Sequence, residues 1–201
     1  MSPVRLTRQE RRGQTREHLI DAAERRFKRD GFHATSLDAI AEEAGYTKGA
    51  VYSNFASKEA LFFAVYERHV DQRTAELETA ITQAPSKREE IRAAVAGADP
   101  GDDGWIAVFF EFWAHVLRHD KHRARFAELH RRGLEPVVRS IAANGPALAP
   151  ELLATAQLAL GNGMQLERLT RPEEVGAADF QDAVWLLARA ALRHDADGEE
   201  R

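Results

Sequence analysis

The chain has 201 residues, no cysteine and a formal net charge of −4, with 44% hydrophobic and 30% charged residues. This composition is typical of an ordinary folded protein, and the lack of cysteine excludes disulfides and thiolate metal sites. No apolar run approaches the roughly 18–20 residues that span a bilayer, and the N-terminus lacks the apolar core of a signal peptide, so we expect a cytoplasmic protein without membrane contact. The apolar periodicity predicts an all-α fold of about nine helices.

The charge is unevenly distributed along the chain. Residues 1–60 hold 11 Lys and Arg against 9 Asp and Glu, whereas residues 61–201 hold 17 against 23. Nucleic-acid binding needs a local basic surface rather than a basic whole, so the asymmetry fits a DNA-binding N-terminal region. We interpret residues 1–13 as a basic arm that either contacts DNA or is only a solubilising tail, and both interpretations stay open.

The first helix follows the arm and is expected to end at Gly31. Its apolar stripe, with Phe27 at the C-terminal end, predicts one buried face. Phe32 is predicted to fill the core of a small three-helix domain over residues 14–60.

The stretch from Thr35 to Lys58 predicts two short helices joined by a tight turn. Ser36 is an N-cap in front of the first helix, and Gly45 supplies the backbone freedom that ends it. Thr47 caps a second helix whose outer face is small and polar, and Ser57 caps the next helix. Such a slim face suits insertion into a major groove, so the stretch is interpreted as a helix-turn-helix.

The string from Ala34 to Leu61, A-T-S-L-D-A-I-A-E-E-A-G-Y-T-K-G-A-V-Y-S-N-F-A-S-K-E-A-L, resembles the DNA-binding signature of the tetracycline-repressor (TetR) family. With the preceding helix, the resemblance covers about the first third of the chain. It implies DNA contacts at Thr47, Lys48 and Tyr52, with Tyr52, Lys58 and Thr35 on phosphates. The neighbouring side chains of Ser53 and Asn54 can reach either the backbone or the bases.

Beyond residue 60 the chain carries no signature. A long helix is expected to about residue 82, followed by helices over about 86–98, 105–118, 121–143, 150–169 and 178–194. The resemblance implies that residues 61–201 form an effector-binding and dimerisation domain. The last two helices carry small residues and heptad-like apolar spacing, which favours a homodimer interface, although packing within one chain is the alternative.

Residues 105–118 are the most apolar segment, W-I-A-V-F-F-E-F-W-A-H-V-L-R. Such a run usually fills a core. In the resembled family the effector cavity opens beside the central helices, so these side chains are also candidates for lining it. A largely apolar cavity selects a small hydrophobic or aromatic effector, oriented by a few polar groups. The candidate ligand-binding residues are Trp105, Phe109, Phe112, Trp113 and Val116, with Asn162 and Gln165 as polar anchors.

Three histidines, His115, His119 and His122, have a spacing that places them on one face of a continuous helix, as a metal site needs. However, Asp120 is expected to break the helix between them, and Glu111 is placed to pair with His115 at i, i+4. The sequence therefore predicts no metal site and no cofactor.

The resulting expectation is a homodimeric transcriptional regulator that binds a palindromic operator on double-stranded DNA, represses, and is released by its effector. An enzyme is not expected, because the chain has no glycine-rich phosphate loop and no G-x-S-x-G motif. The alternative is a helical dimeric adaptor without sequence-specific DNA binding. In such an adaptor the arginine-rich N-terminus would have no assigned function.

Overall fold

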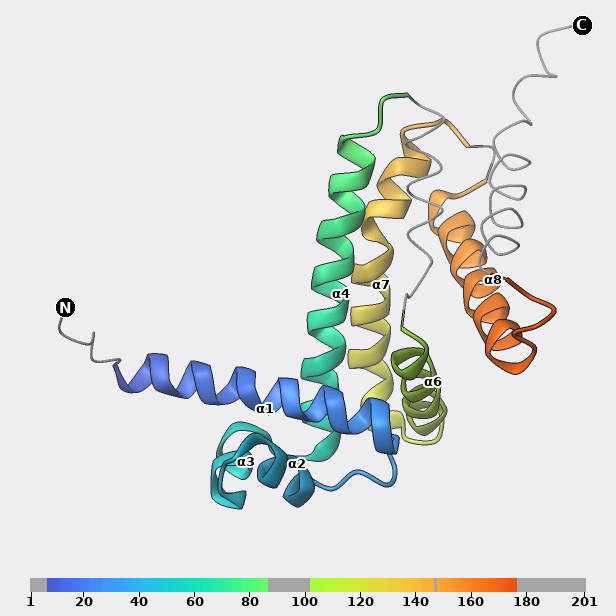
Figure 1. Ribbon diagram of the computed structural model, residues 1–201. Helices are drawn as coiled ribbons and strands as arrows, with labels where there is room; N and C mark the ends of the chain where they lie inside the picture. Colours follow the sequence, from blue (N-terminus) through green and yellow to red (C-terminus); the bar gives the residue numbers. More distant parts are fainter. Residues whose placement is uncertain (1–6, 87–101, 147, 177–201) are drawn as a thin grey trace, which may run out of the picture. The chain divides into compact units, whose positions relative to one another are not determined.

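The computed structural model describes residues 7–86, 102–146 and 148–176 (Figure 1). These residues form seven helices rather than the nine expected, with no strand among them. They are α1 (Arg8–Asp30), α2 (Leu37–Ala44), α3 (Lys48–Asn54), α4 (Lys58–Thr82), α6 (Asp103–Leu117), α7 (Asp120–Ala142) and α8 (Pro150–Thr170). The two further expected helices, at about 86–98 and 178–194, lie outside the described residues apart from residue 86. None of the described helices is long and apolar enough to cross a membrane.

By its internal contacts the chain divides into two compact units. The first is Met1–His69 with Gly104–Phe126, and the second is Val70–Asp103 with Ala127–Arg201. Compactness does not define function, so the domain limits after residues 13 and 60 stay predictions.

The N-terminal helix begins earlier than the sequence suggests. We expected residues 8–13 in the arm, but they belong to α1. The Thr7 hydroxyl accepts the Glu10 N–H at 3.2 Å, and the Glu10 carboxylate accepts the Thr7 N–H at 2.6 Å. This reciprocal capping box satisfies backbone donors of the first turn and allows the helix to start there, despite Gly13 within it.

The core of the first unit is built around aromatic rings. Phe32 is buried as predicted, and its ring lies 5.5 Å from that of Phe62 and 4.9 Å from that of Phe112, edge-on in both cases. Phe62 and Phe112 stack at 4.0 Å between centroids. These contacts join the segment after α1 to α4 and α6, so Phe112 is primarily a core residue. Helices α1, α2 and α3 pack against one another beside this core (Figure 1).

Ion pairs fix α1 against α4 within the same unit. The Arg68 guanidinium pairs with Asp21 at 2.5 Å and also with Glu24, and His69 Nε2 lies 3.0 Å from a Glu24 oxygen. Because Glu24 is partly buried, this network orients α1 more firmly than an exposed pair would.

The second unit packs the C-terminal part of α4 against α7 and α8. Its core centres on Leu77, Val137 and Ala154. At its edge Arg132 donates to Asp71 at 2.7 Å, and Arg139 pairs with Glu78. These two pairs, about two turns apart along both helices, set the register of α7 on α4.

The turn between α1 and α2 is held by charged side chains from distant helices. The Lys58 ammonium of α4 donates to the carbonyls of Phe32 (2.7 Å), His33 (3.1 Å) and Thr35 (2.8 Å). The Glu111 carboxylate of α6 accepts the N–H groups of Phe32 (2.7 Å) and His33 (2.8 Å). The expected pairing of Glu111 with His115 is therefore wrong, since backbone donors outside the helix occupy this carboxylate.

Gly31 is required at the start of this turn. Its φ is 82°, a conformation that L side chains rarely adopt, and a Cβ there would lie 2.9 Å from Glu111 Oε2. We predict that Gly31→Ala lowers the free energy of unfolding by about 1–3 kcal/mol, from backbone strain and displacement of the carboxylate. Urea denaturation measures this change.

Gly13→Ala is the matched control. Gly13 lies within α1, and a Cβ added there would meet no atom within 4 Å, so alanine should stabilise the protein by roughly 0.5–1 kcal/mol. Equal effects of the two substitutions would contradict the role given to Gly31.

Candidate nucleic-acid interface

The α2–turn–α3 segment has the capped geometry that the sequence predicts. The Ser36 hydroxyl accepts the Ala39 N–H at 3.1 Å, and α2 ends at Gly45 in the left-handed conformation, with φ 71° and ψ 27°. The Thr47 hydroxyl then accepts the Ala50 N–H at 3.2 Å. Inward-facing Val51 is fully buried, which fixes which face of α3 is turned outward.

The outer face of α3 is exposed and polar. Tyr52 is 58% exposed, and Thr47, Lys48 and Ser53 are exposed as well. The Ser53 hydroxyl and the Asn54 amide both donate to the Ala50 carbonyl, at 2.9 and 2.8 Å. The Ser53 hydroxyl oxygen also accepts from Asn54 Nδ2 at 3.4 Å, the Asn54 amide oxygen remains as an acceptor, and Tyr52 presents its phenol directly to solvent.

Lys48 has a partner that the sequence analysis missed. Its ammonium pairs with the Asp38 carboxylate of α2, and this bond raises the pKa of Lys48. Both side chains are exposed, so the pair contributes little to stability and can be exchanged for another anion or acceptor. The pair holds the lysine beside the N-terminus of α3.

Thr35 and Lys58 are placed differently from the exposed set. Thr35 is buried, and its hydroxyl donates to the Gly31 carbonyl at 2.7 Å. The three donors of the Lys58 ammonium match the three carbonyls that it contacts, and burial lowers its pKa. In this arrangement both side chains shape the turn before α2, and their phosphate contacts stay predictions.

Arginines of α1 extend the basic surface towards α3. Arg12 Nη2 donates to the Ser53 carbonyl at 3.4 Å, and the Arg16 guanidinium lies 4.4 Å from the centre of the Phe55 ring. With Arg8 they follow one helical face at i, i+4 and i+8. That spacing would have identified the set if α1 had been predicted to begin at Arg8.

The candidate effector residues fall in both compact units. Trp105 and Val116 are buried with Phe112 in the first unit, where Trp105 stacks on His69 at 3.8 Å between centroids. Phe109 and Trp113 of the same helix are only half-buried. This leaves them as the better-placed members of the set for contact with a small molecule.

The proposed polar anchors lie on α8 in the second unit. Gln165 is buried, and its side-chain oxygen accepts from Arg168 Nε at 3.1 Å, so it is already hydrogen-bonded within the helix. Asn162 is half-buried.

Two family models match this chain. Residues 19–65 match the model described as "Bacterial regulatory proteins, tetR family", and residues 86–194 match "BetI-type transcriptional repressor, C-terminal". The second match alone covers more than half of the 201 residues. The chain belongs to the TetR family.

Individual relatives agree with this assignment. The chain is 38% identical over 111 residues to the HTH-type transcriptional activator FasR of Mycolicibacterium smegmatis, covering 55% of this chain and 44% of FasR. Over 64 residues it is 44% identical to the regulator AcrR of Shigella flexneri, covering 32% and 29%. The chain thus spans less than half the length of these first relatives. They support its membership of the TetR family, but their individual activities are not assigned to this chain.

Among solved structures, a TetR-family regulator from Rhodococcus sp. has a TM-score of 0.76 at 17% identity, covering 90% of this chain and 99% of that one. This likeness shows the fold alone. Together the comparisons make this TetR-family chain a transcriptional regulator with a DNA-binding helix-turn-helix, in a family whose members are not enzymes.

The position of Lys58 generates a stability prediction. Lys58→Met removes donors from three carbonyls, so we expect the free energy of unfolding to fall by about 1–3 kcal/mol. Lys48→Met, which breaks only an exposed pair, should change it by less than about 0.5 kcal/mol. Urea midpoints of the two variants provide the comparison. If Lys58→Met unfolds at the wild-type midpoint, the three carbonyl bonds do not stabilise the turn.

Proposed function

We propose that this TetR-family protein is a repressor that binds a palindromic operator as a homodimer and is released by a small, largely hydrophobic effector. The observation that carries the DNA-binding part is the outward face of α3. Helix α3 is short and capped by Thr47, and its outward face is exposed and polar. The arginines of α1 lie beside this face. A slim helix of this kind enters the major groove, while adjacent cations neutralise phosphates.

We assign the roles within this face from chemistry and exposure. Lys48 reads a base by exchanging Asp38 for an acceptor such as guanine O6 or N7. Tyr52 contacts a phosphate, and Thr47, Ser53 and Asn54 supply further polar contacts. Thr35 and Lys58, for which the family resemblance implies phosphate contacts, act here by holding the turn in front of α2.

The homodimer is supported by an apolar stripe on α8. Leu152, Ala159 and Leu166 are exposed and recur at i, i+7 and i+14, which places them on one face of the helix. Leu152 and Leu166 are 56% and 44% exposed. Such heptad spacing suits a helix that packs against a second copy. In the DNA-bound dimer the two reading helices should lie about 34–36 Å apart, one turn of the double helix.

The sign of regulation differs between a family and a protein that this chain resembles. The C-terminal family model is described as a repressor, whereas the relative FasR is named an activator. We favour repression, in which effector binding lowers operator affinity because the ligand prefers another spacing of the reading helices. A reporter gene behind the selected operator, with and without the protein, tests this choice. A regulator of this kind acts in the cytoplasm, where its operator DNA lies.

The effector proposal rests on the half-buried aromatic surface of α6. Phe109 and Trp113 lie 5.6 Å apart between ring centroids, and Phe126 lies 5.4 Å from Trp113. An apolar or aromatic molecule packs well on such rings. One protein of the same fold, FadR from Bacillus subtilis, was solved in complex with stearoyl-CoA. It is 16% identical to this chain with a TM-score of 0.69, covering 86% of this chain and 96% of that one. At this identity its ligand is not transferred to this chain.

A selection of bound fragments from random duplex DNA tests the proposed function directly. A regulator enriches a palindrome whose half-sites match the dimer, and its affinity falls steeply between two salt concentrations. An adaptor that lacks sequence-specific binding enriches no motif, and this outcome would replace the proposal.

Two substitutions on α3 should have contrasting effects on DNA binding. Tyr52→Phe should weaken binding to every duplex by a similar factor, because a phosphate contact carries no sequence information. Lys48→Ala should lose about 1–3 kcal/mol mainly at one base position per half-site. Titrations against the selected operator and its single-base variants separate the two patterns. A base-specific loss for Tyr52→Phe would reassign that side chain to groove readout.

The effector should be visible through Trp113. A hydrophobic ligand that releases operator DNA should change tryptophan emission, and operator DNA must weaken ligand binding by the same factor that the ligand weakens operator binding. We expect Trp113→Ala to reduce both ligand affinity and ligand-induced release. Unchanged values in a folded Trp113→Ala protein would exclude the α6 surface as the ligand site.

A further inference from the structure

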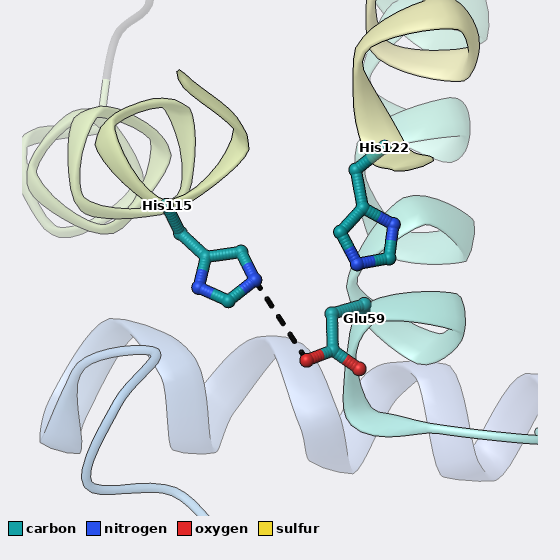
Figure 2. A group of neighbouring side chains, drawn as sticks. All are labelled: Glu59, His115 and His122. Atoms are coloured by element: carbon teal, nitrogen blue, oxygen red, sulfur yellow. Dashed lines mark ion pairs between the residues drawn. The ribbon is translucent and has the colours of Figure 1, made fainter. Parts of the chain in front are cut away.

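Three metal-ligating side chains from three helices converge in the first compact unit. Glu59 lies in the first turn of α4, His115 near the end of α6 and His122 in the first turn of α7 (Figure 2). One ligand atom from each lies within 4.8 Å of the other two, and His115 Nε2 is 3.8 Å from Glu59 Oε1. Figure 2 shows both imidazole rings turned towards the Glu59 carboxylate.

The two imidazoles each leave a buried nitrogen without a hydrogen bond. His115 Nε2 and His122 Nε2 are both inaccessible to solvent and have no hydrogen-bond partner in the structure. The 3.8 Å separation from Glu59 is too long for a hydrogen bond. Buried polar atoms nearly always have a partner, so two such atoms beside one carboxylate indicate that something binds between them.

Burial and neighbouring charges shift the pKa of all three side chains. Burial lowers the pKa of both His115 and His122, assisted by His119 at His115 and by Lys121 at His122, while the Glu59 carboxylate opposes the shift in both. Burial opposes ionisation of Glu59, but hydrogen bonds from its own backbone N–H and from Ser57, together with the charges of His122 and His115, outweigh it and lower the pKa of this carboxyl.

Phenylalanine rings and further imidazoles surround the two histidines. Between ring centroids, Phe32 and Phe112 lie 5.2 and 5.8 Å from His115, and Phe63 lies 5.8 Å from His122. The His119 ring stacks on that of His115 at 4.0 Å, while His119 Nδ1 lies 2.7 Å from the His115 carbonyl oxygen. His33 lies 5.7 Å from His115 between ring centroids, and Lys121 acts on His122 as a nearby positive charge. The side chains of His115 and Glu59 are 12% and 23% exposed, so the cluster lies near the surface of the first compact unit although both Nε2 atoms are covered.

We propose that Glu59, His115 and His122 form a binding site for a divalent transition-metal ion of the zinc type. Two imidazole nitrogens and one carboxylate oxygen are a frequent ligand set for such ions, whereas calcium and magnesium prefer oxygen ligands only. Ligands about 2.1 Å from a tetrahedral ion lie roughly 3.4 Å apart, so the ligand atoms need to move closer by about 1 Å. Remaining coordination positions are filled by water.

The histidine spacing alone does not predict this site. The helix breaks between Leu117 and Asp120, which removes the single-helix face that His115, His119 and His122 would share. The fold instead brings His122 to His115 across that break and adds Glu59, more than fifty residues earlier. An ion there joins the first turn of α4 to the corner between α6 and α7.

Metal binding is tested with the untagged, full-length protein after treatment with a chelator. Calorimetric titration with Zn²⁺, and titration with Co²⁺ followed by visible absorption, should give one ion per chain. Saturating Zn²⁺ should raise the melting temperature, because an ion that binds only the folded state stabilises it. Mg²⁺ should do neither.

Single substitutions locate the site. His115→Ala, His122→Ala and Glu59→Gln should each weaken Zn²⁺ binding by about 100-fold or more and abolish the thermal shift. His18→Ala is the matched control, because this exposed histidine of α1 is bonded to Tyr46 at 2.9 Å and lies outside the cluster, and it should bind as wild type does. Glu59→Gln keeps the side-chain shape, so it remains informative if a histidine variant fails to fold.

Several results would overturn the proposal. They are the absence of a stoichiometric ion at about tens of micromolar Zn²⁺, wild-type affinity in Glu59→Gln or in a folded histidine variant, and an equal thermal shift with Mg²⁺. Since none of these measurements uses DNA, the outcome is independent of the proposed repressor function.

Discussion

The turn between α1 and α2 depends on two opposite charges that reach it from other helices. Lys58 supplies donors to the carbonyls of Phe32, His33 and Thr35, and Glu111 supplies acceptors to the N–H groups of Phe32 and His33. The backbone groups of such a turn have no regular hydrogen-bond pattern among themselves. Burying them without a partner lowers the stability of the folded state. The two side chains therefore determine where Phe32 enters the core, and through it how α2 and α3 are presented.

This arrangement also gives a lysine of the DNA-binding motif a structural role. Lys58 closely follows α3 in the sequence, and a positive charge there is naturally interpreted as a phosphate contact. Its ammonium is committed to three carbonyls, however, whereas the exposed Lys48 and Tyr52 are directed outward. The number of hydrogen-bond donors that a lysine already uses within the protein is thus a better guide to its role than its closeness in sequence to α3.

Most of the local structure could be predicted from the sequence. Ser36, Gly45 and Thr47 act through neighbours three or four residues away, so their roles as caps follow from residue type and spacing. The same reasoning predicted the limits of α4, α7 and α8 to within a residue or two. The start of α1 was missed because the Thr7–Glu10 capping box lies within a stretch whose many arginines resemble an unstructured arm.

What the sequence could not supply are contacts between residues far apart in the chain. No spacing rule links Glu111 to Phe32, Lys48 to Asp38, or Glu59 to His115 and His122, because tertiary packing alone brings them together. For the same reason the effector residues were assigned from their apolar character, which does not distinguish the core residue Phe112 from the half-buried Trp113.

The contact between Gly31 and Glu111 has a consequence for how this chain can vary. The carboxylate that holds the turn occupies the space that any side chain at position 31 would need. The two positions are far apart in the sequence, yet each limits what the other tolerates. Part of the penalty for a larger residue at 31 disappears once the carboxylate at 111 is gone, so the effects of changing both are not additive. Whether a substitution is tolerated at one of the two positions therefore depends on which residue already occupies the other.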